Sequence, residues 1–212
     1  MIELFKHLFE LDFPWLFDQY GTAVYVVLFV VIFIETGLVI MPFLPGDSLL
    51  FASGMFAAQG YLNIALVLGL LFIAAVLGDN INYWLGRKIG LGVLKWKIRG
   101  RQLVKEKYLD DTHAFFQKNG TKAIIMARFV PIVRTFTPFA AGIGKMDYAK
   151  KFFPYDVLGG FLWIFSLTLA GYFLGNITWI KENIEKVCLA IILISVLPMM
   201  IGFIRSKFAR RA

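Results

Sequence analysis

The sequence predicts an all-α integral membrane protein with four transmembrane helices and two opposed re-entrant helical hairpins. Of its 212 residues, 59% are hydrophobic and only 17% are charged, against about 25% in soluble domains. The mean hydropathy is +0.72. Several apolar runs approach the roughly 20 residues that a helix needs to cross a bilayer. Two other apolar runs are broken by proline and glycine, which lipid tolerates only where protein or water covers the freed backbone groups.

The unbroken apolar runs give four predicted spans, at residues 22–41, 61–86, 152–175 and 187–204. The broken runs, 42–58 and 121–144, are too short on either side of their breaks to cross. We therefore expect each to enter and leave on one face, from opposite sides of the membrane. Each precedes a glycine-containing span, which suggests a weak inverted repeat. Short broken segments in corresponding positions of two halves are typical of a transporter's binding site near the midplane.

The charged segments set the expected topology of a single membrane domain over residues 21–208. The basic loop 87–118 carries eight Lys or Arg and one acid between residues 87 and 107. We expect this loop to be helical and cytoplasmic, together with the basic tail 205–212, because positive residues remain inside. This places both termini in the cytoplasm. Residues 1–20 fit an interfacial helix or, equally, a mobile leader.

The net charge of +8 fits an anionic lipid surface as partner, and no nucleic-acid-binding motif is present. Cys188 lies in an apolar run, so packing is its expected role. His7 and His113 are isolated, so we expect no metal site and no cofactor. No nucleophile–base pair is present, so we expect no enzyme.

Two arginines in the second broken segment are the candidate anion-binding residues. Arg128 and Arg134 flank Pro131 and remain cationic wherever they lie. A guanidinium group binds phosphate or carboxylate bidentately, so one interpretation is a phosphate site. In the alternative, the two arginines pair with Glu35 and Asp47 as internal ties. The interpretations are compatible, because a ligand anion could displace a carboxylate that then takes a proton.

Four acids are candidates for proton coupling. Burial raises the pKa of a carboxylate and a nearby arginine lowers it, so Glu35 and Asp47 can change protonation as their partners move. Intramembrane acids often mark proton relays. Asp47 would equally serve as a helix N-cap behind Pro45-Gly46. Asp79 and Asp156 are further candidates, although both fall close to a predicted membrane boundary.

At this point several motifs resemble one known family, the DedA family of VTT (SNARE-associated) domain membrane proteins. The resemblance covers roughly residues 20–175. The motifs are Glu35 with Pro42-x-x-Pro45-Gly46-Asp47, Gly78-Asp79 with Tyr83-x-x-Gly86, Phe129-x-Pro131-x-x-Arg134 with Pro138-x-x-Ala141-Gly142, and Gly159 with Trp163. The family's functional charges map onto Glu35, Asp47, Arg128 and Arg134. One departure is Asp156, where the family's pattern has asparagine.

The resemblance implies a protein of the bacterial inner membrane with two opposed re-entrant segments and a role in lipid transport. Bacterial members are associated with the return of undecaprenyl phosphate across the membrane, which supports envelope biogenesis, and with dependence on proton motive force. We therefore expect a proton-coupled transporter of a lipid phosphate, with membrane lipids and protons as partners. The alternatives are a proton-dependent exporter of small cations or drugs, a phospholipid scramblase, and a non-catalytic membrane factor. A homo-oligomer is compatible with the sequence.

Overall fold

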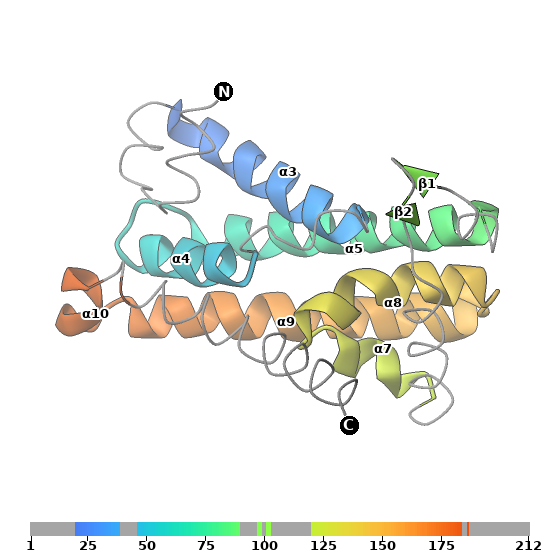
Figure 1. The fold of residues 1–212 in the computed structure, drawn as a ribbon. Helices are drawn as coiled ribbons and strands as arrows, with labels where there is room; N and C mark the ends of the chain where they lie inside the picture. Colours follow the sequence, from blue (N-terminus) through green and yellow to red (C-terminus); the bar gives the residue numbers. More distant parts are fainter. Residues whose placement is uncertain are drawn as a thin grey trace, which may run out of the picture. The chain divides into compact units, whose positions relative to one another are not determined.

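The computed structural model describes residues 20–38, 46–89, 97–98, 101–102, 120–183 and 186. These residues are helical apart from turns, short connections and one small strand pair (Figure 1). The elements in chain order are η1 (Gly21–Ala23), α3 (Val24–Gly37), α4 (Gly46–Ala58), α5 (Ile64–Ile89), β1 (Lys97–Ile98), β2 (Arg101–Gln102), α7 (Lys122–Ala127), α8 (Pro131–Ile143), η3 (Tyr148–Phe152), α9 (Phe153–Leu174) and α10 (Thr178–Glu182). The predicted helical class is therefore confirmed in the described part of the chain.

In the part of the chain that the structure describes, two helices are long and apolar enough to cross a membrane. They are Ile64–Ile89, with 26 residues, and Tyr148–Leu174, with 27 residues, which joins η3 to α9. They correspond to the predicted second and third spans. The predicted first span corresponds to a shorter apolar helix, Gly21–Gly37. The fourth predicted span, residues 1–19 and the basic tail lie outside the described residues, so four membrane crossings remain a prediction.

The basic loop differs from its prediction. Helix α5 continues to Ile89 and so includes the start of the predicted loop. Within the loop, β1 and β2 pair antiparallel, with Lys97 opposite Gln102. A helical loop is thus wrong for these described residues, which form a tight strand pair instead.

The chain breaks at the second proline-containing segment as predicted. Helix α7 ends at Ala127, and α8 begins at Pro131 after Val130, whose backbone is extended at φ −119° and ψ 106°. A residue before proline is pushed toward extended conformations, and proline suits a helix start because its missing N–H would have no intrahelical partner there. The break therefore follows directly from the position of Pro131.

Helix α4 begins one residue earlier than its predicted N-cap position. It starts at Gly46, so Asp47 lies in the first turn rather than capping it. The carboxylate still benefits from the positive end of the helix dipole. The 13 residues of α4 rise about 20 Å, short of the roughly 30 Å of a hydrocarbon core. Re-entry on one face remains a prediction.

The chain divides into two compact units. Unit 1 takes its described residues from 1–29, 45–71 and 164–212, and unit 2 takes them from 30–44 and 72–163. Helices α3, α5 and α9 contribute residues to both units. The predicted functional charges other than Asp47 all lie in unit 2.

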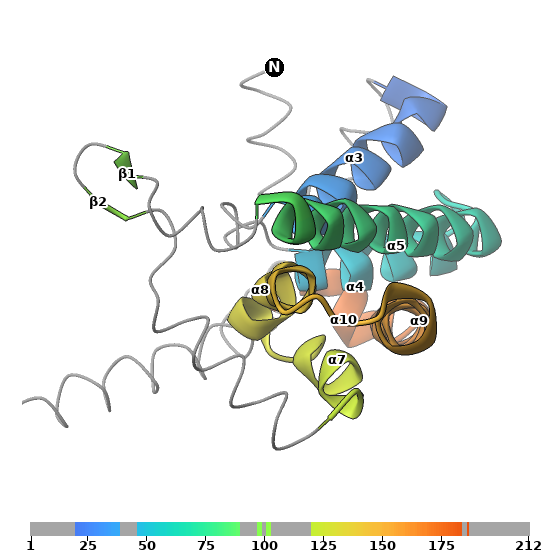
Figure 2. The same cartoon turned by 90° about the vertical axis from the view of Figure 1, so that its right-hand side faces the viewer.

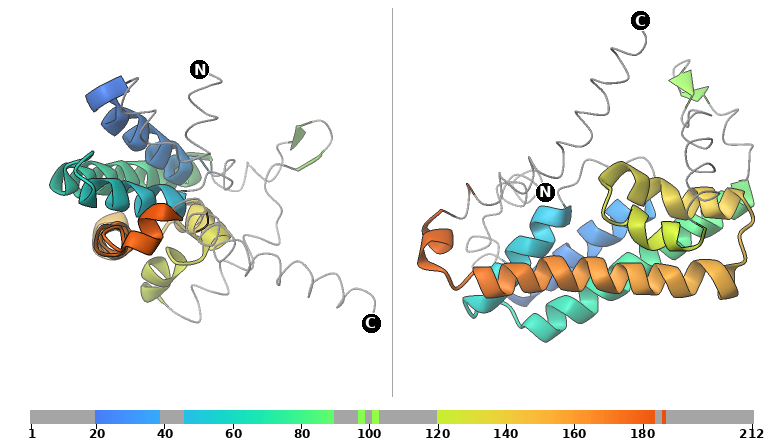
Figure 3. Two further views of the ribbon diagram at one scale, coloured as in Figure 1. Left: turned by 90° about the vertical axis from the view of Figure 1, so that its left-hand side faces the viewer. Right: turned by 90° about the horizontal axis from the view of Figure 1, so that it is seen from below.

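In unit 1, α4 packs closely against the second half of α9 (Figure 3). A Cβ atom built at Gly54 would overlap the carbonyl oxygen of Thr168, and one built at Gly171 would overlap the carbonyl oxygen of Phe51. Small residues at membrane helix interfaces allow this backbone approach. The close packing therefore depends on both glycines.

In unit 2, α8 packs in the same way against the second half of α5 (Figure 2). A Cβ atom at Gly142 would overlap the carbonyl oxygen of Tyr83, and one at Gly86 would overlap that of Phe139. The spacing of these pairs matches that in unit 1, since each glycine follows the overlapped residue of its own helix by three positions. Each unit thus contains one short helix held by the same glycine arrangement, as an internal repeat would give. The inverted topology of that repeat remains a prediction.

Candidate functional site

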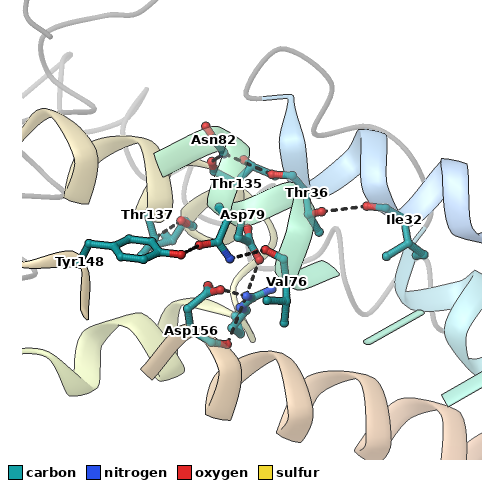
Figure 4. A network of polar contacts seen from close by, with 12 residues as sticks. Ile32, Thr36, Val76, Asp79, Asn82, Thr135, Thr137, Tyr148 and Asp156 are labelled. Carbon is teal, nitrogen blue, oxygen red and sulfur yellow. Dashed lines mark hydrogen bonds and ion pairs between the residues drawn. The ribbon is translucent and has the colours of Figure 1, made fainter. Parts of the chain in front are cut away.

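A buried cluster of charged and amide side chains occupies unit 2 (Figure 4). Its members come from five segments: α3, α5, the turn after α7, α8 and the start of α9. Burial of ionised groups is costly unless they are paired and hydrogen-bonded. The buried members are Glu35, Asp79, Asn82, Arg128, Arg134 and Asp156.

Arg128 is held by two aspartates from different helices. Its Nη2 donates a hydrogen bond of 2.6 Å to Oδ1 of Asp156 and forms a second ion pair with the Asp79 carboxylate. The side chain of Arg128 is 3% exposed, and both aspartates are fully buried. One guanidinium nitrogen therefore ties α5 and α9 to the turn that follows α7.

Two glycines of α9 leave the space that this guanidinium fills. A Cβ atom at Gly159 would lie 3.2 Å from Cγ of Arg128, and one at Gly160 would lie 3.6 Å from its Nη2. The first distance is tighter than an ordinary van der Waals contact. The glycine pair thus lets the arginine stem pass close to the helix backbone before its head reaches the two aspartates.

Arg134 forms a third ion pair in the cluster. Its Nη2 donates to Oε1 of Glu35 at 2.5 Å, and the two side chains are 4% and 1% exposed. The guanidinium carbon lies 4.3 Å from the ring centroid of the buried Trp163. A desolvated cation over an indole face gains about 2 kcal/mol. Arg134 is thus held by a carboxylate from α3 and an aromatic face from α9.

Asn82 joins three helices next to these ion pairs. Its Nδ2 donates to the carbonyl oxygen of Thr36 at 3.2 Å and to that of Thr135 at 2.8 Å. Thr36 lies in the last turn of α3, where carbonyls lack intrahelical donors. Asn82 therefore positions the end of α3, next to Glu35, against the helix that carries Arg134.

Some buried polar atoms of the cluster retain unused bonding capacity. Among the described residues, no hydrogen-bond partner is present for Nη1 of Arg128, Oδ1 of Asp79, Oδ2 of Asp156 or Oδ1 of Asn82. Buried polar side-chain atoms in proteins usually have a partner. Nη1 of Arg128 can therefore donate to a ligand oxygen or to water, and the three oxygens can accept a hydrogen bond from water or a ligand; the two carboxylates can also take a proton.

The structure brings together five of the six charges singled out from the sequence. Glu35 pairs with Arg134, as the internal-tie interpretation expects. The aspartates on Arg128 are Asp79 and Asp156, two acids that the sequence places near membrane boundaries and that the structure buries completely. Asp47 lies in unit 1, partly buried in the first turn of α4. The two proposed roles, phosphate binding and proton coupling, remain predictions.

The roles of two residues at the site were not predicted from the sequence. Asn82 follows Asp79 by three positions in α5, so both lie on one helix face, and that spacing was an available signal. Trp163 was named only as part of a family motif, because nothing in the sequence places its ring against an arginine. In the described part of the chain, no group of three or more His, Cys, Asp or Glu side chains is arranged to hold a metal ion.

The chain is similar in sequence to several known proteins over most of its length. The VTT domain model matches residues 44–173. Protein DedA of Escherichia coli K12 is 44% identical over 211 residues, covering 99% of this chain and 94% of the relative. An uncharacterized membrane protein of Mycobacterium leprae is 44% identical over 173 residues, covering 82% of this chain and 76% of the relative. Inner membrane protein YqjA of E. coli K12 is 32% identical over 205 residues, covering 95% and 91%. No solved structure matches.

Proposed function

Because this chain belongs to the DedA family of VTT-domain membrane proteins, we propose that it is a proton-coupled transporter of a lipid phosphate. The expected cargo is undecaprenyl phosphate, moved across the bacterial inner membrane in support of envelope biogenesis. The relatives from M. leprae and E. coli are named as membrane proteins, and the described residues include two helices long and apolar enough to span a bilayer. Cargo, coupling and topology are parts of the proposal.

The observation that carries the proposal is a pair of buried arginines in a membrane protein. Arg128 and Arg134 are 3% and 4% exposed, and a charge at membrane depth is costly enough that it usually serves a function. Arginine remains cationic there and matches phosphate geometry with two parallel hydrogen bonds. In Arg128, Nη1 has no hydrogen-bond partner among the described residues, which leaves one edge of the guanidinium for a phosphate oxygen.

The carboxylates give the arginines a way to release and rebind their ligand. In the proposed cycle, a phosphate head displaces a carboxylate from Arg128 or Arg134, and the displaced acid takes up a proton. Glu35 is the acid on Arg134, and Asp47 is a second predicted coupling residue. The apolar tail of the cargo would remain in lipid, next to the exposed apolar face of α5 that includes Ile73, Leu77 and Ile81.

Transport by the purified protein in liposomes tests the proposal. A fluorescent polyprenyl phosphate is added to one leaflet, and its movement is followed with and without a pH gradient. We expect movement by the wild type that a pH gradient accelerates, and at least a tenfold loss in Arg128→Gln and Arg134→Gln, which corresponds to about 1.4 kcal/mol or more. Arg87→Gln is the matched control, because Arg87 is exposed and outside the cluster. No movement by a folded wild-type protein, or equal rates in all four proteins, would refute the proposal.

The cluster also offers one specific argument for a cation exporter. Its buried carboxylates outnumber its buried guanidinium groups in the described residues, as a cation-binding site would require. An exporter of cationic compounds predicts resistance that depends on Glu35 and Asp47 but survives loss of both arginines. A scramblase predicts movement of zwitterionic phospholipid in the same liposomes, without a response to the pH gradient.

A further inference from the structure

The buried charges of the cluster do not balance. In the described part of unit 2, three buried carboxylates, those of Glu35, Asp79 and Asp156, accompany two buried guanidinium groups. Fully ionised, the five groups carry a net charge of −1. A buried ion that lacks a counter-charge is penalised by several kcal/mol even after the protein relaxes. The cluster therefore needs one further positive charge.

The pairing pattern shows where that charge belongs. Arg134 pairs with Glu35, and these two charges offset each other. Arg128 meets two acids through the same Nη2 atom, so the excess carboxylate lies here. The other oxygens, Oδ1 of Asp79 and Oδ2 of Asp156, have no hydrogen-bond partner among the described residues.

We propose that Asp79 and Asp156 share one proton in the ligand-free protein and that this pair, next to Arg128, carries the coupling proton. The inference rests on the proposed function and deepens it, because it names an acid pair and a stoichiometry for the coupling. Two carboxylates that meet at one cation titrate as a pair, so the proton belongs to both residues.

Among the described residues, the other groups around the pair supply no further positive charge to it. Arg134, the other buried arginine of the cluster, pairs with Glu35. From η3, the hydroxyl of Tyr148 donates to Oδ1 of Asn80 at 2.5 Å. Asn82 in α5 is neutral and donates to backbone carbonyls. The lysines of unit 2 whose side chains are described, and Arg87, are exposed to the surroundings, where their charge is screened.

Charge balance then gives the number of protons taken up for each phosphate bound. At rest, Arg128 and the singly protonated aspartate pair sum to zero. When a phosphate monoanion binds Arg128, the site remains neutral only if the displaced carboxylate takes one proton, so that both aspartates become protonated. Release of the phosphate returns that proton. The geometry therefore assigns uptake of one proton for each monoanionic head group bound at Arg128.

Infrared spectroscopy of the ligand-free protein in nanodiscs tests the shared proton directly. Labelling with isotopically heavy aspartate shifts the C=O stretch of a protonated aspartic acid and separates it from glutamic acid. We expect one such band in the wild type at neutral pH. It should vanish in Asp156→Asn and in Asp79→Asn, because either change balances the charges. Asp147→Asn, an exposed aspartate of the same unit, should retain the band.

A further variant tests the inference even if the aspartate variants do not fold. Arg128→Gln removes the cation that both aspartates contact, so the intensity of the band should rise to that of two protonated aspartates per chain. Absence of the band in folded wild type, or its persistence in Asp156→Asn, would overturn the inference. A band that emerges only after sodium is removed would also overturn it, since a bound cation would then supply the charge.

The same preparation separates this inference from the proposed function. The band is read without any ligand, so it can be present even if liposomes show no lipid movement, which would refute only the transport role. Lipid movement without the band would refute only the shared proton. In wild type, adding inorganic phosphate at neutral pH should increase the infrared signal of protonated aspartate. If phosphate binds and this signal does not increase, the stated stoichiometry is contradicted.

Discussion

The ion pair between Glu35 and Arg134 gives the sharpest prediction about stability. The joined atoms lie 2.5 Å apart and both side chains are almost fully buried. At an effective dielectric constant of about 20, the attraction is on the order of 6 kcal/mol before desolvation is subtracted. Removing one partner of a buried pair costs about 3–5 kcal/mol, because the remaining charge stays buried. We therefore expect Arg134→Gln and Glu35→Gln each to lower the free energy of unfolding by that amount.

The double variant is the decisive measurement. Glu35→Gln/Arg134→Gln leaves two neutral amides, so it should recover at least about 2 kcal/mol relative to the sum of the single changes. Unfolding in mixed micelles with increasing denaturing detergent reports all three values. Lys150→Gln, an exposed cation of the same unit, should change stability by less than about 0.5 kcal/mol. Additive losses, or single losses below about 1 kcal/mol, would refute the view that this pair is mutually dependent.

Three further predictions concern packing and positioning. Asn82→Ala should lower the unfolding free energy by about 1–3 kcal/mol, because two buried carbonyls lose their side-chain donor; thermal unfolding in detergent measures this. Gly54→Ala should lower the free energy of unfolding by about 1–3 kcal/mol, since the new Cβ overlaps a backbone carbonyl of α9. Gly69→Ala is the control: a Cβ there has nothing within 4 Å, so the free energy of unfolding should stay the same or rise by up to about 1 kcal/mol. Trp163→Leu should cost about 2 kcal/mol or more in the same assay, because Arg134 loses its aromatic face; equal stability of Trp163→Leu and Trp163→Phe would contradict a cation–π role.

The sequence by itself determined the helical class, the two long apolar helices and the break at Pro131. These features depend on local chemistry: apolar length sets what can cross a bilayer, and Pro131, which follows an extended residue, begins a new helix. The sequence also identified every buried charge of the cluster, because charges in apolar runs are rare and stand out. Its two errors of local structure, the helical form expected at residues 97–98 and 101–102 of the basic loop and the N-cap role of Asp47, concern a few residues each.

Only the tertiary structure decided which charge meets which. Arg128 pairs with Asp79 and Asp156 because α5, the turn after α7 and the start of α9 converge, and because Gly159 leaves room for the arginine stem. Electrostatic partners far apart in sequence carry no local signature, since either arginine is equally suited to any of the acids. The packing of glycine-lined helix faces selects the pairs, and that selection leaves one carboxylate in excess beside Arg128.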